Sequence, residues 1–235
     1  MPKVRPIKDV VDMKAIKDEI NYEYAQLLAK AKPLKADLLI IPHDPLGDKL
    51  ATPSLLSLSC TVAMIMKLKM GLIGTKETLK RMAEGIVLHR HYEAWFKDAN
   101  KDLTIYTEMA LRNDETVGVP DIVYCSASEC GLIELKATWQ LTEDKRKAYV
   151  MQMSMYYDML REFNITEAYI VTMNKVDMVP VRELEAEVNN AKQVLKDASG
   201  DYPRYPPNPK QCLNCILKPV CPSYKNLMDK LLFNQ

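Results

Sequence analysis

The chain has 235 residues, which is enough for one sizeable domain with an appendage. Hydrophobic residues make up 48% and charged residues 27%, as in ordinary globular proteins. The formal net charge is +1, so any binding of nucleic acid needs a local basic patch. No apolar run approaches the roughly 18 residues of a membrane span. The first eight residues lead into no apolar signal core, so we expect a cytoplasmic protein without membrane contact.

The first third of the chain predicts helical segments separated by a strand. Residues 8–32 mix polar and apolar side chains without proline, which favours a helix that ends at Pro33. A short strand is expected over 38–41. The apolar, methionine-rich run 55–70 predicts one buried helix or two short ones.

The longest predicted helix covers residues 75–100. Its apolar side chains fall on one stripe at helical spacing: Leu79, Met82, Ala83, Ile86 and Phe96. His89 lies on the flank of this stripe and is expected to face the interior, either as a satisfied core residue or as a ligand. Gly85, one turn before His89, costs helix stability and would let another backbone or a ligand come close.

The second half of the chain alternates between strands and helices. We expect strands over 103–111, 118–124, 131–137 and 167–173, and helices over 142–163 and 182–198. The loop 125–130 is the right length to join the second and third of these strands as a hairpin. This order predicts an α/β fold in which helices pack against a mixed sheet.

Three charged residues gather on the predicted hairpin. Glu134 and Lys136 are two residues apart on a strand, so their side chains share one face. Asp121, on the other strand, can approach that face. Two carboxylates suit a hard divalent cation such as Mg²⁺, and the lysine could hold an attacking water. The alternative is a cross-strand salt bridge on a solvated sheet face.

Three further residues are candidates for the same site. Glu108 lies on the preceding predicted strand, either as a solvated residue or as a supporting carboxylate. Gln152 and Tyr156 are four residues apart on a predicted helix, so both side chains can reach the same neighbour. The alternative for this pair is a hydrogen bond at the edge of the core.

Three cysteines near the C-terminus predict a metal or cluster centre. Cys212 and Cys215 are separated by two residues, and Cys221 follows with Pro222 directly after it. Because no export signal is expected, a disulfide framework is not expected either. Four thiolates bind an iron–sulfur cluster or a structural zinc ion. Unligated thiols are the remaining alternative.

The fourth ligand of such a centre must come from elsewhere in the chain. Cys60 lies in the apolar run 55–70 and is the first candidate. Cys125 and Cys130, in the hairpin loop, compete with it. With Cys60 as a ligand, the centre would fasten the C-terminal tail to the buried helix.

Several of these residues together form an ordered set of motifs. The set reads Gly85-x-x-x-His89, Pro120-Asp121, Glu134-Leu135-Lys136 and Gln152-x-x-x-Tyr156. It resembles the RecB-type nucleases of the PD-(D/E)xK superfamily. One cysteine before the motifs and a Cys-x2-Cys-x5-Cys group after them are similar to the iron–sulfur branch of those nucleases. The chain looks most like the CRISPR-associated RecB-like exonuclease of that branch, over about residues 55–225.

The resemblance implies a restriction-endonuclease-like fold, with a mixed sheet flanked by helices and an iron–sulfur-bearing helical and C-terminal cap. It places a nuclease core at 55–200, after an N-terminal helical extension at 1–54. The cysteine-containing segment 201–235 would pack back on the region of Cys60, around a 4Fe-4S cluster or alternatively zinc. Thr61 and Val62 depart from the proline and basic residue that often follow the first cysteine in the family.

The resemblance also implies a role for each motif residue. Four groups would hold a Mg²⁺ or Mn²⁺ ion: the side chains of His89, Asp121 and Glu134 and the backbone carbonyl of Leu135. Lys136 would orient the water and stabilise charge on the phosphate. Gln152 and Tyr156 would brace the site or contact the DNA.

The activity that this resemblance implies is hydrolysis of single-stranded DNA from an end, in CRISPR spacer acquisition. Integrase proteins are the expected partners, and a homo-oligomer is also considered. Alternatives are a repair, replication or virus-borne nuclease with the same chemistry, and a non-catalytic iron–sulfur binding module of an integrase complex. Candidate contacts to DNA are Lys145, Arg146, Lys147, Tyr202, Arg204 and Tyr205. Alternatively, these six belong to a solvated helix turn and an ordered linker.

Overall fold

The computed structural model describes residues 2–42, 52–57, 60–113, 116–199, 212 and 215–221. Its central element is a five-stranded sheet in the order β10-β9-β8-β7-β4. The strands are β4 (Thr104–Thr107), β7 (Ile122–Cys125), β8 (Cys130–Lys136), β9 (Ile165–Thr172) and β10 (Val176–Val179). β8 and β9 run parallel, and the other neighbouring strands run antiparallel. The sheet is therefore mixed, as the sequence predicts.

Helix α4 (Glu143–Met159) connects the parallel strands β8 and β9. A tight turn reverses the chain and so joins only antiparallel strands, whereas two parallel strands need a crossover connection. The hydroxyl of Thr142 begins the helix by accepting a hydrogen bond from the backbone N–H of Lys145. Acidic residues follow in the first turn, where they suit the positive end of the helix dipole. The crossover carries Gln152 and Tyr156 across the sheet.

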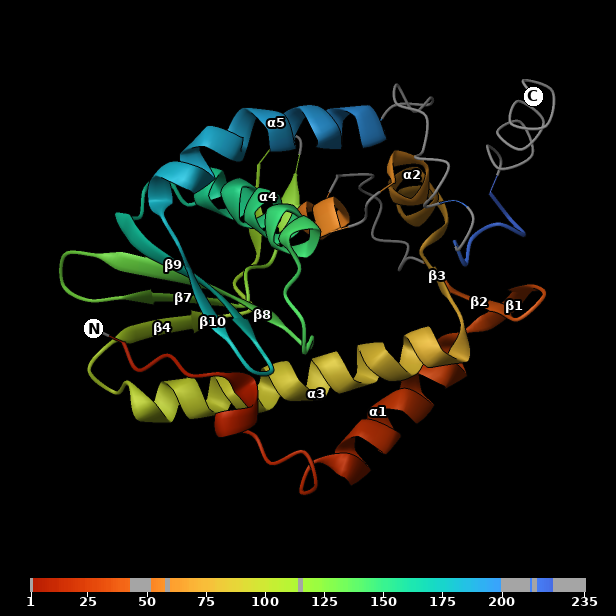
Figure 1. Ribbon diagram of the computed structural model, residues 1–235, viewed down its shortest axis with the longest axis horizontal. Coiled ribbons are helices and arrows are strands. Elements are labelled where there is room, and N and C mark those ends of the chain that lie inside the picture. The colour runs from red at the N-terminus through yellow and green to blue at the C-terminus, as the bar shows by residue number, and fades with distance from the viewer. Residues whose placement is uncertain are drawn as a thin grey trace.

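Helices cover both faces of the sheet (Figure 1). α3 (Lys76–Ala99) lies along one face, where Phe96 packs in one core with Ile133 and Leu135. α4 covers the opposite face, where Met153 packs with Leu132, and α5 (Val181–Ser199) packs on α4. Alternate residues of β8 thus enter two different cores. Both faces of this strand are buried along residues 131–135.

The N-terminal segment contributes to the core under the sheet. Ile7, in the short helix η1 (Ile7–Asp9), and Val11 are buried together with the α3 side chains. The backbone N–H of Lys8 donates to the carbonyl of Met173 at 3.0 Å, which ties this segment to the end of β9. α1 (Lys17–Lys30) then packs on the outer side of α3. The first residues assigned to an extension therefore share a core with the sheet.

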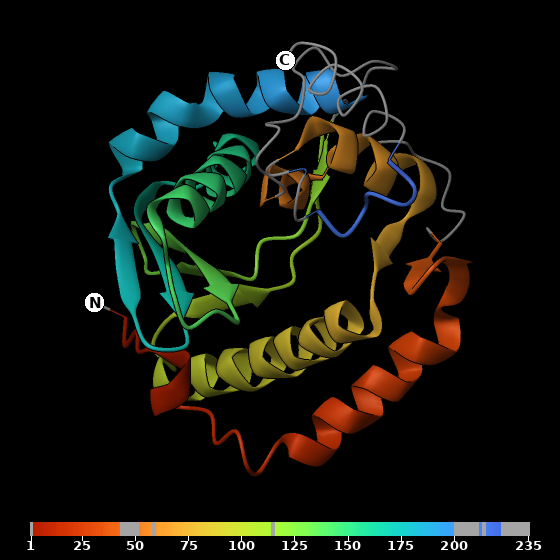
Figure 2. The ribbon, with the colours of Figure 1, turned by 45° about the vertical axis from the view of Figure 1, so that its right-hand side comes forward.

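A second unit sits at the N-terminal end of α3. It contains a three-stranded sheet in the order β1-β2-β3 and the helices that precede β3. Its elements are β1 (Lys32–Lys35), β2 (Leu38–Ile41), η2 (Pro53–Ser57), α2 (Thr61–Met70) and β3 (Leu72–Gly74). Figure 2 shows the chain running from α2 through β3 to the start of α3. A two-stranded ribbon, β5 (Leu111–Arg112) and β6 (Val117–Gly118), completes the fold.

Most predicted elements are confirmed, with some corrections. The long helix lies where it was predicted, and 55–70 forms two helices. The hairpin forms, but its first strand begins at Ile122 and not at Gly118, so Asp121 directly precedes it. The helix predicted over 8–32 is shorter, because α1 covers only Lys17–Lys30. The predicted strand 103–111 is wrong in extent, because β4 ends at Thr107 and β5 begins at Leu111. Met82, placed on the apolar stripe of α3, is 39% exposed. No helix in the described part of the chain combines the length and apolar character needed to cross a bilayer.

Candidate active site

The candidate site lies where β7 and β8 meet at one end of the sheet. Ile122 pairs with Ile133, so the register brings Asp121 opposite Glu134 one step further along. The backbone N–H of Leu135 donates to Asp121 Oδ2 at 2.7 Å. This hydrogen bond fixes the Asp121 carboxylate against β8. The hairpin therefore brings the two acids together, as the sequence predicts.

His89 reaches the site from α3, which covers the sheet face opposite to α4. Its Nδ1 atom lies 3.3 Å from Asp121 Oδ1, and its side chain is 26% exposed. Burial by itself lowers the pKa of the imidazole, but the neighbouring Asp121 carboxylate outweighs burial and raises it. For Asp121, burial favours a higher pKa, but His89, Lys136 and the Leu135 N–H together hold the pKa below its usual value.

Glu134 is the most deeply buried acid of the site, with 2% of its surface exposed. Its Oε1 atom accepts hydrogen bonds from Lys136 Nζ at 2.5 Å and from Gln152 Nε2 at 2.8 Å. Its Oε2 atom is buried and has no hydrogen-bond partner among the described residues. A buried carboxylate oxygen without a partner is costly to desolvate. A cation bound at the site would supply the partner that this oxygen lacks.

The pKa values of Glu134 and Lys136 are shifted by burial and by the charges of neighbouring groups. Burial, followed by the charge of Asp121, raises the pKa of Glu134 to about 7. Burial by itself lowers the pKa of Lys136, but the neighbouring Glu134 and Asp121 carboxylates outweigh burial and raise it. The ammonium group is therefore charged at neutral pH. It also lies 4.8 Å from the centre of the Tyr149 ring, a contact that the sequence did not predict.

Helix α4 completes the site from above the sheet. Gln152 Oε1 accepts a hydrogen bond from Lys136 Nζ at 3.1 Å, and Gln152 Nε2 donates to the hydroxyl of Tyr156 at 3.0 Å. Gln152 thus contacts Lys136 directly, whereas Tyr156 hydrogen-bonds to Gln152, so the predicted approach of both side chains to one neighbour stays a prediction. A Cβ atom on Gly118 would lie 2.8 Å from the Tyr156 ring, so this glycine makes room for the tyrosine.

Two more carboxylates lie beside the hydrogen-bonded pair of His89 and Asp121. Glu93, one helical turn after His89, is 8% exposed. Burial, together with the charges of Asp121 and Glu108, raises the pKa of Glu93 to about 7. The four-residue spacing from His89 is a signal that could have identified Glu93. Sequence reasoning missed it.

Glu108 is not on a strand, contrary to its predicted position. It follows β4 with a φ of 50°, in the left-handed region that favours glycine, and its side chain is exposed. Its backbone N–H donates to the carbonyl of Asp121 at 3.2 Å. Glu108 thus contacts Asp121 through the backbone, and its role as a catalytic carboxylate stays a prediction.

The donors present fit a hard cation by type. Carboxylate oxygens, an imidazole and backbone carbonyls are ligands of Mg²⁺ and Mn²⁺, and Glu134 Oε2 is open. In the described residues, no three acidic, histidine or cysteine side chains form a ready ligand set. His89 contacts an oxygen of Asp121, and Lys136 hydrogen-bonds to an oxygen of Glu134. Leu135 stays a predicted ligand through its carbonyl.

The four cysteines predicted as ligands line one small cavity. Cys60 is the N-cap residue of α2, and Cys212, Cys215 and Cys221 approach it from the C-terminal segment. The cavity volume is about 20 Å³, and Val62, Met66 and Leu217 also line it. All four thiols are free. Burial and the three neighbouring thiols raise the pKa of Cys212.

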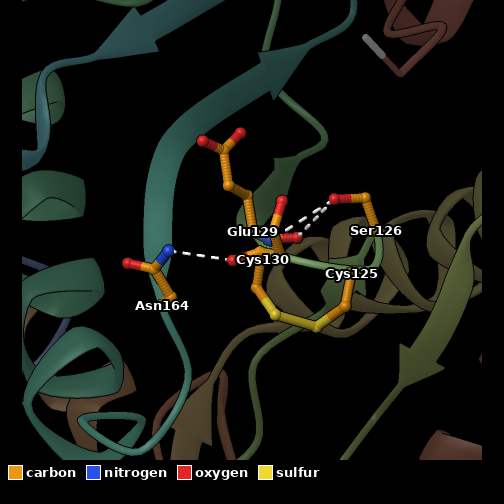
Figure 3. Close-up of a disulfide and its surroundings, with 6 residues drawn as sticks. Cys125, Ser126, Glu129, Cys130 and Asn164 are labelled. Atoms are coloured by element: carbon orange, nitrogen blue, oxygen red, sulfur yellow. Dashed lines mark hydrogen bonds between the residues drawn. A yellow bond between two sulfur atoms is a disulfide. The ribbon is translucent and has the colours of Figure 1, made fainter.

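Cys125 and Cys130 are not part of this group. They form a disulfide with an S–S distance of 2.07 Å that closes the hairpin between β7 and β8 (Figure 3). Their role as competitors for the fourth ligand position is therefore corrected, whereas the other four cysteines are free. Asn164 braces the same loop by donating to the carbonyl of Ser128 at 2.9 Å.

The predicted contacts to DNA differ in their surroundings. Lys145 Nζ donates to Thr138 Oγ1 and to the carbonyl of Gln140, so it holds the β8–α4 connection. Arg146 forms ion pairs with Asp177 and Glu183 that point it toward β10 and α5. Lys147 is exposed. The other three candidates, Tyr202, Arg204 and Tyr205, lie outside the described residues.

Comparisons with known proteins relate the chain to others by fold. No family model matches the sequence, and no curated protein matches it. The crystal structure of a protein named SSO0001 is similar to this chain, with a TM-score of 0.50 and 14% sequence identity. The alignment covers 90% of this chain and 97% of that one. At this identity the similarity shows the fold alone: the chain shares its α/β architecture with a solved protein over nearly its whole length.

Proposed function

We propose that this chain is a Mg²⁺- or Mn²⁺-dependent deoxyribonuclease of the RecB-like, PD-(D/E)xK type. The observation that carries the proposal is the unpartnered, buried Oε2 atom of Glu134 beside Asp121 and Lys136. A plain salt bridge on a solvated face would leave both carboxylate oxygens in water. Here one oxygen is kept dry, and the hydrogen bonds of Lys136 and Gln152 hold the other.

Each side chain has a role that follows from its contacts. Asp121, Glu134, His89 and the carbonyl of Leu135 would hold the cation, and the Leu135 N–H keeps Asp121 oriented toward it. Lys136 supplies a buried positive charge for the phosphate and for the attacking water. Gln152 hydrogen-bonds to both Lys136 and Glu134, and Tyr156 hydrogen-bonds to Gln152. Such supporting hydrogen bonds tune the groups that they orient.

A bound Mg²⁺ or Mn²⁺ ion supplies Lewis-acid polarisation of the phosphate and a lowered pKa of water. The substrate that we propose is the end of a single DNA strand, cut during CRISPR spacer acquisition. Integrase proteins are the proposed partners.

We also propose that Cys60, Cys212, Cys215 and Cys221 hold an iron–sulfur cluster, with zinc as the alternative. Four free thiols lining one cavity support a centre of this ligand type, since both clusters and structural zinc are bound by four thiolates, although the thiols do not yet form a ready ligand set in the described residues. Such a centre would hold the C-terminal segment against α2. It would thereby form the predicted cap over the small three-stranded sheet.

A cleavage assay tests the proposed activity. End-labelled single-stranded DNA is incubated with Mn²⁺ and the wild-type chain, Asp121→Ala or Lys136→Ala. We expect each substitution to slow cleavage by about 100-fold or more, the scale of losing one electrostatic or acid–base group. Asp98→Ala, an exposed acid on the same helix as His89, is the matched control and should cleave normally. Equal cleavage by all four proteins would reject the proposal.

A further inference from the structure

The two tryptophans of the chain have opposite surroundings. Trp95 packs against Tyr92 and Phe96, with ring centroids 5.2 Å and 6.4 Å away. Trp139 is 55% exposed, on the connection between β8 and α4. A large aromatic side chain held in water forgoes the favourable burial of its apolar surface. The exposed ring of Trp139 is therefore available to contact a ligand.

The backbone on both sides of Trp139 is firmly held. The N–H of Thr138 donates to the carbonyl of Lys136 at 2.7 Å, and the N–H of Met173 donates to the carbonyl of Thr138 at 3.1 Å. Lys145 Nζ donates to Thr138 Oγ1 at 3.2 Å and to the carbonyl of Gln140 at 3.3 Å. Trp139 stands between these two anchored residues. Little backbone entropy is left to lose when a ligand covers its ring.

This anchored turn adjoins the candidate active site. Trp139 is three residues after Lys136, so their Cα atoms are at most about 11 Å apart. Lys145, which holds the turn, lies one helical turn before Tyr149 on α4, and the Tyr149 ring contacts the Lys136 ammonium. Trp139 and Lys136 are thus linked along the chain that follows β8 and, through Lys145 and Tyr149, by contacts with α4. These contacts keep the turn of Trp139 close to the Lys136 end of β8.

We propose that Trp139 stacks on an unpaired nucleobase of the DNA strand whose phosphate is bound at Lys136. This inference rests on the proposed nuclease function and specifies what the site recognises. Stacking on an aromatic ring tolerates any base, because every base has a π face. In a duplex each base is already paired and stacked between neighbours. A stacking side chain beside the reacting phosphate therefore selects single-stranded DNA or a frayed end.

Tryptophan fluorescence tests the stacking contact without any cleavage. In the Trp95→Phe variant, Trp139 is the sole tryptophan, and EDTA removes the divalent cation. Titration with a short oligothymidylate should quench the emission to a plateau, whereas a duplex of equal length closed at both ends by non-nucleotide linkers should quench it much less. Absence of quenching by the single strand, or equal quenching by the duplex, would overturn the inference.

Cleavage kinetics supply an independent test. Trp139→Ala should raise KM for single-stranded DNA by about 5- to 100-fold, the effect of losing one base–aromatic stack, with kcat changed less than 3-fold. Trp139→Phe should retain most of the affinity. Tyr22→Ala removes an aromatic side chain that is 68% exposed on α1, and it should match the wild type. An unchanged KM in Trp139→Ala, or an effect on kcat alone, would contradict stacking.

The two proposals can fail separately. If the wild-type chain does not cleave DNA in Mn²⁺, the nuclease proposal fails. The fluorescence titration measures binding without cleavage and can still succeed or fail in that case. Cleavage that requires Asp121 and Lys136 but is indifferent to Trp139 would retain the nuclease and reject the stacking contact.

Discussion

Gln152 and Glu134 are 18 residues apart in the sequence and share a buried hydrogen bond of 2.8 Å. The same amide group contacts Lys136 through its oxygen, so one side chain of α4 orients the two central residues of β8. Glu134 Oε1 accepts hydrogen bonds from Gln152 and Lys136, whereas Oε2 has no hydrogen-bond partner among the described residues. The helix that crosses over the sheet therefore sets which carboxylate oxygen is available.

Replacing this amide should weaken the site without unfolding the chain. Gln152→Met keeps the length of the side chain but removes its three hydrogen bonds, to Glu134, Lys136 and Tyr156. Loss of a supporting hydrogen bond typically costs 10- to 100-fold in metal affinity or activity, so we expect a decrease of about that size in the Mn²⁺-dependent cleavage rate. Gln193→Met on α5 removes a similar hydrogen bond, to Asp197, away from the site. If both variants cleave equally well, Gln152 does not orient Glu134.

Glu93 should make stability depend on pH. Its folded-state pKa is raised to about 7, chiefly by burial, whereas the ordinary glutamate value is 4.5. Ionisation of this group is then harder in the folded than in the unfolded chain. Its contribution to stability is present below about pH 4.5 and is lost as the pH rises toward 7.

Urea unfolding in EDTA at pH 5 and pH 8 checks this dependence on Glu93. The free energy of unfolding of Glu93→Gln, relative to the wild type, should increase between the two pH values by on the order of 1 kcal/mol after solvent screening. Glu77→Gln, on an exposed position of the same helix, should show no such change. A relative stability of Glu93→Gln that is flat or falls with pH would rule out the raised pKa.

Arg146 should act on stability rather than on DNA. Its guanidinium group donates to Asp177 Oδ2 at 2.7 Å and to both oxygens of Glu183, joining α4 to β10 and α5. Arg146→Ala is expected to lower the free energy of unfolding by about 1–3 kcal/mol, the range for hydrogen bonds to charged groups. Lys147→Ala, its exposed neighbour, should leave stability unchanged. Normal stability combined with lost DNA binding in Arg146→Ala would support the sequence-based prediction instead.

The cysteine cavity predicts which thiols bind iron. Protein purified without oxygen should absorb broadly near ~400 nm, as expected of thiolate-bound iron. Cys60→Ser should lose most of this absorbance and most of its iron. Cys125→Ser should retain both, because Cys125 is paired with Cys130 in the hairpin. If the iron content falls equally in the two variants, the centre has been assigned to the wrong cysteines. A colourless protein that contains zinc would show that zinc, not iron, is bound.

Much of the fold could be predicted because its signals are local. The long helix was predicted over 75–100 and is observed over Lys76–Ala99, since Thr75 caps it and its buried side chains recur at helical spacing. The hairpin of β7 and β8 follows from two apolar runs and a short polar loop. β10 was missed, because Asp177 interrupts a run of four residues that becomes a strand only by pairing with β9. The pairing of β2 with β3 joins segments more than 30 residues apart and leaves no local pattern.

The same distinction explains the candidate site. Glu134 and Lys136 on β8, and Gln152 and Tyr156 on α4, are related by spacing within one element, and the structure brings these pairs together with Asp121. The sequence did not predict contacts that depend on how the helices pack against the sheet and against each other. The Tyr149 ring beside Lys136 and the ion pairs of Arg146 arise from the position of α4 over the sheet and against α5.

The central claim is that a divalent cation binds between His89, Asp121 and Glu134, and an equilibrium titration with Mn²⁺ tests it most directly. Electron paramagnetic resonance of free Mn²⁺ measures the bound fraction for the wild type, Glu134→Gln and Asp121→Asn, and Asp98→Asn serves as the exposed control. The account predicts one site per chain in the wild type and the control, with affinity at least about 10-fold weaker in the two site variants. Binding that is equally tight in all four proteins, or absent from the wild type, would contradict it.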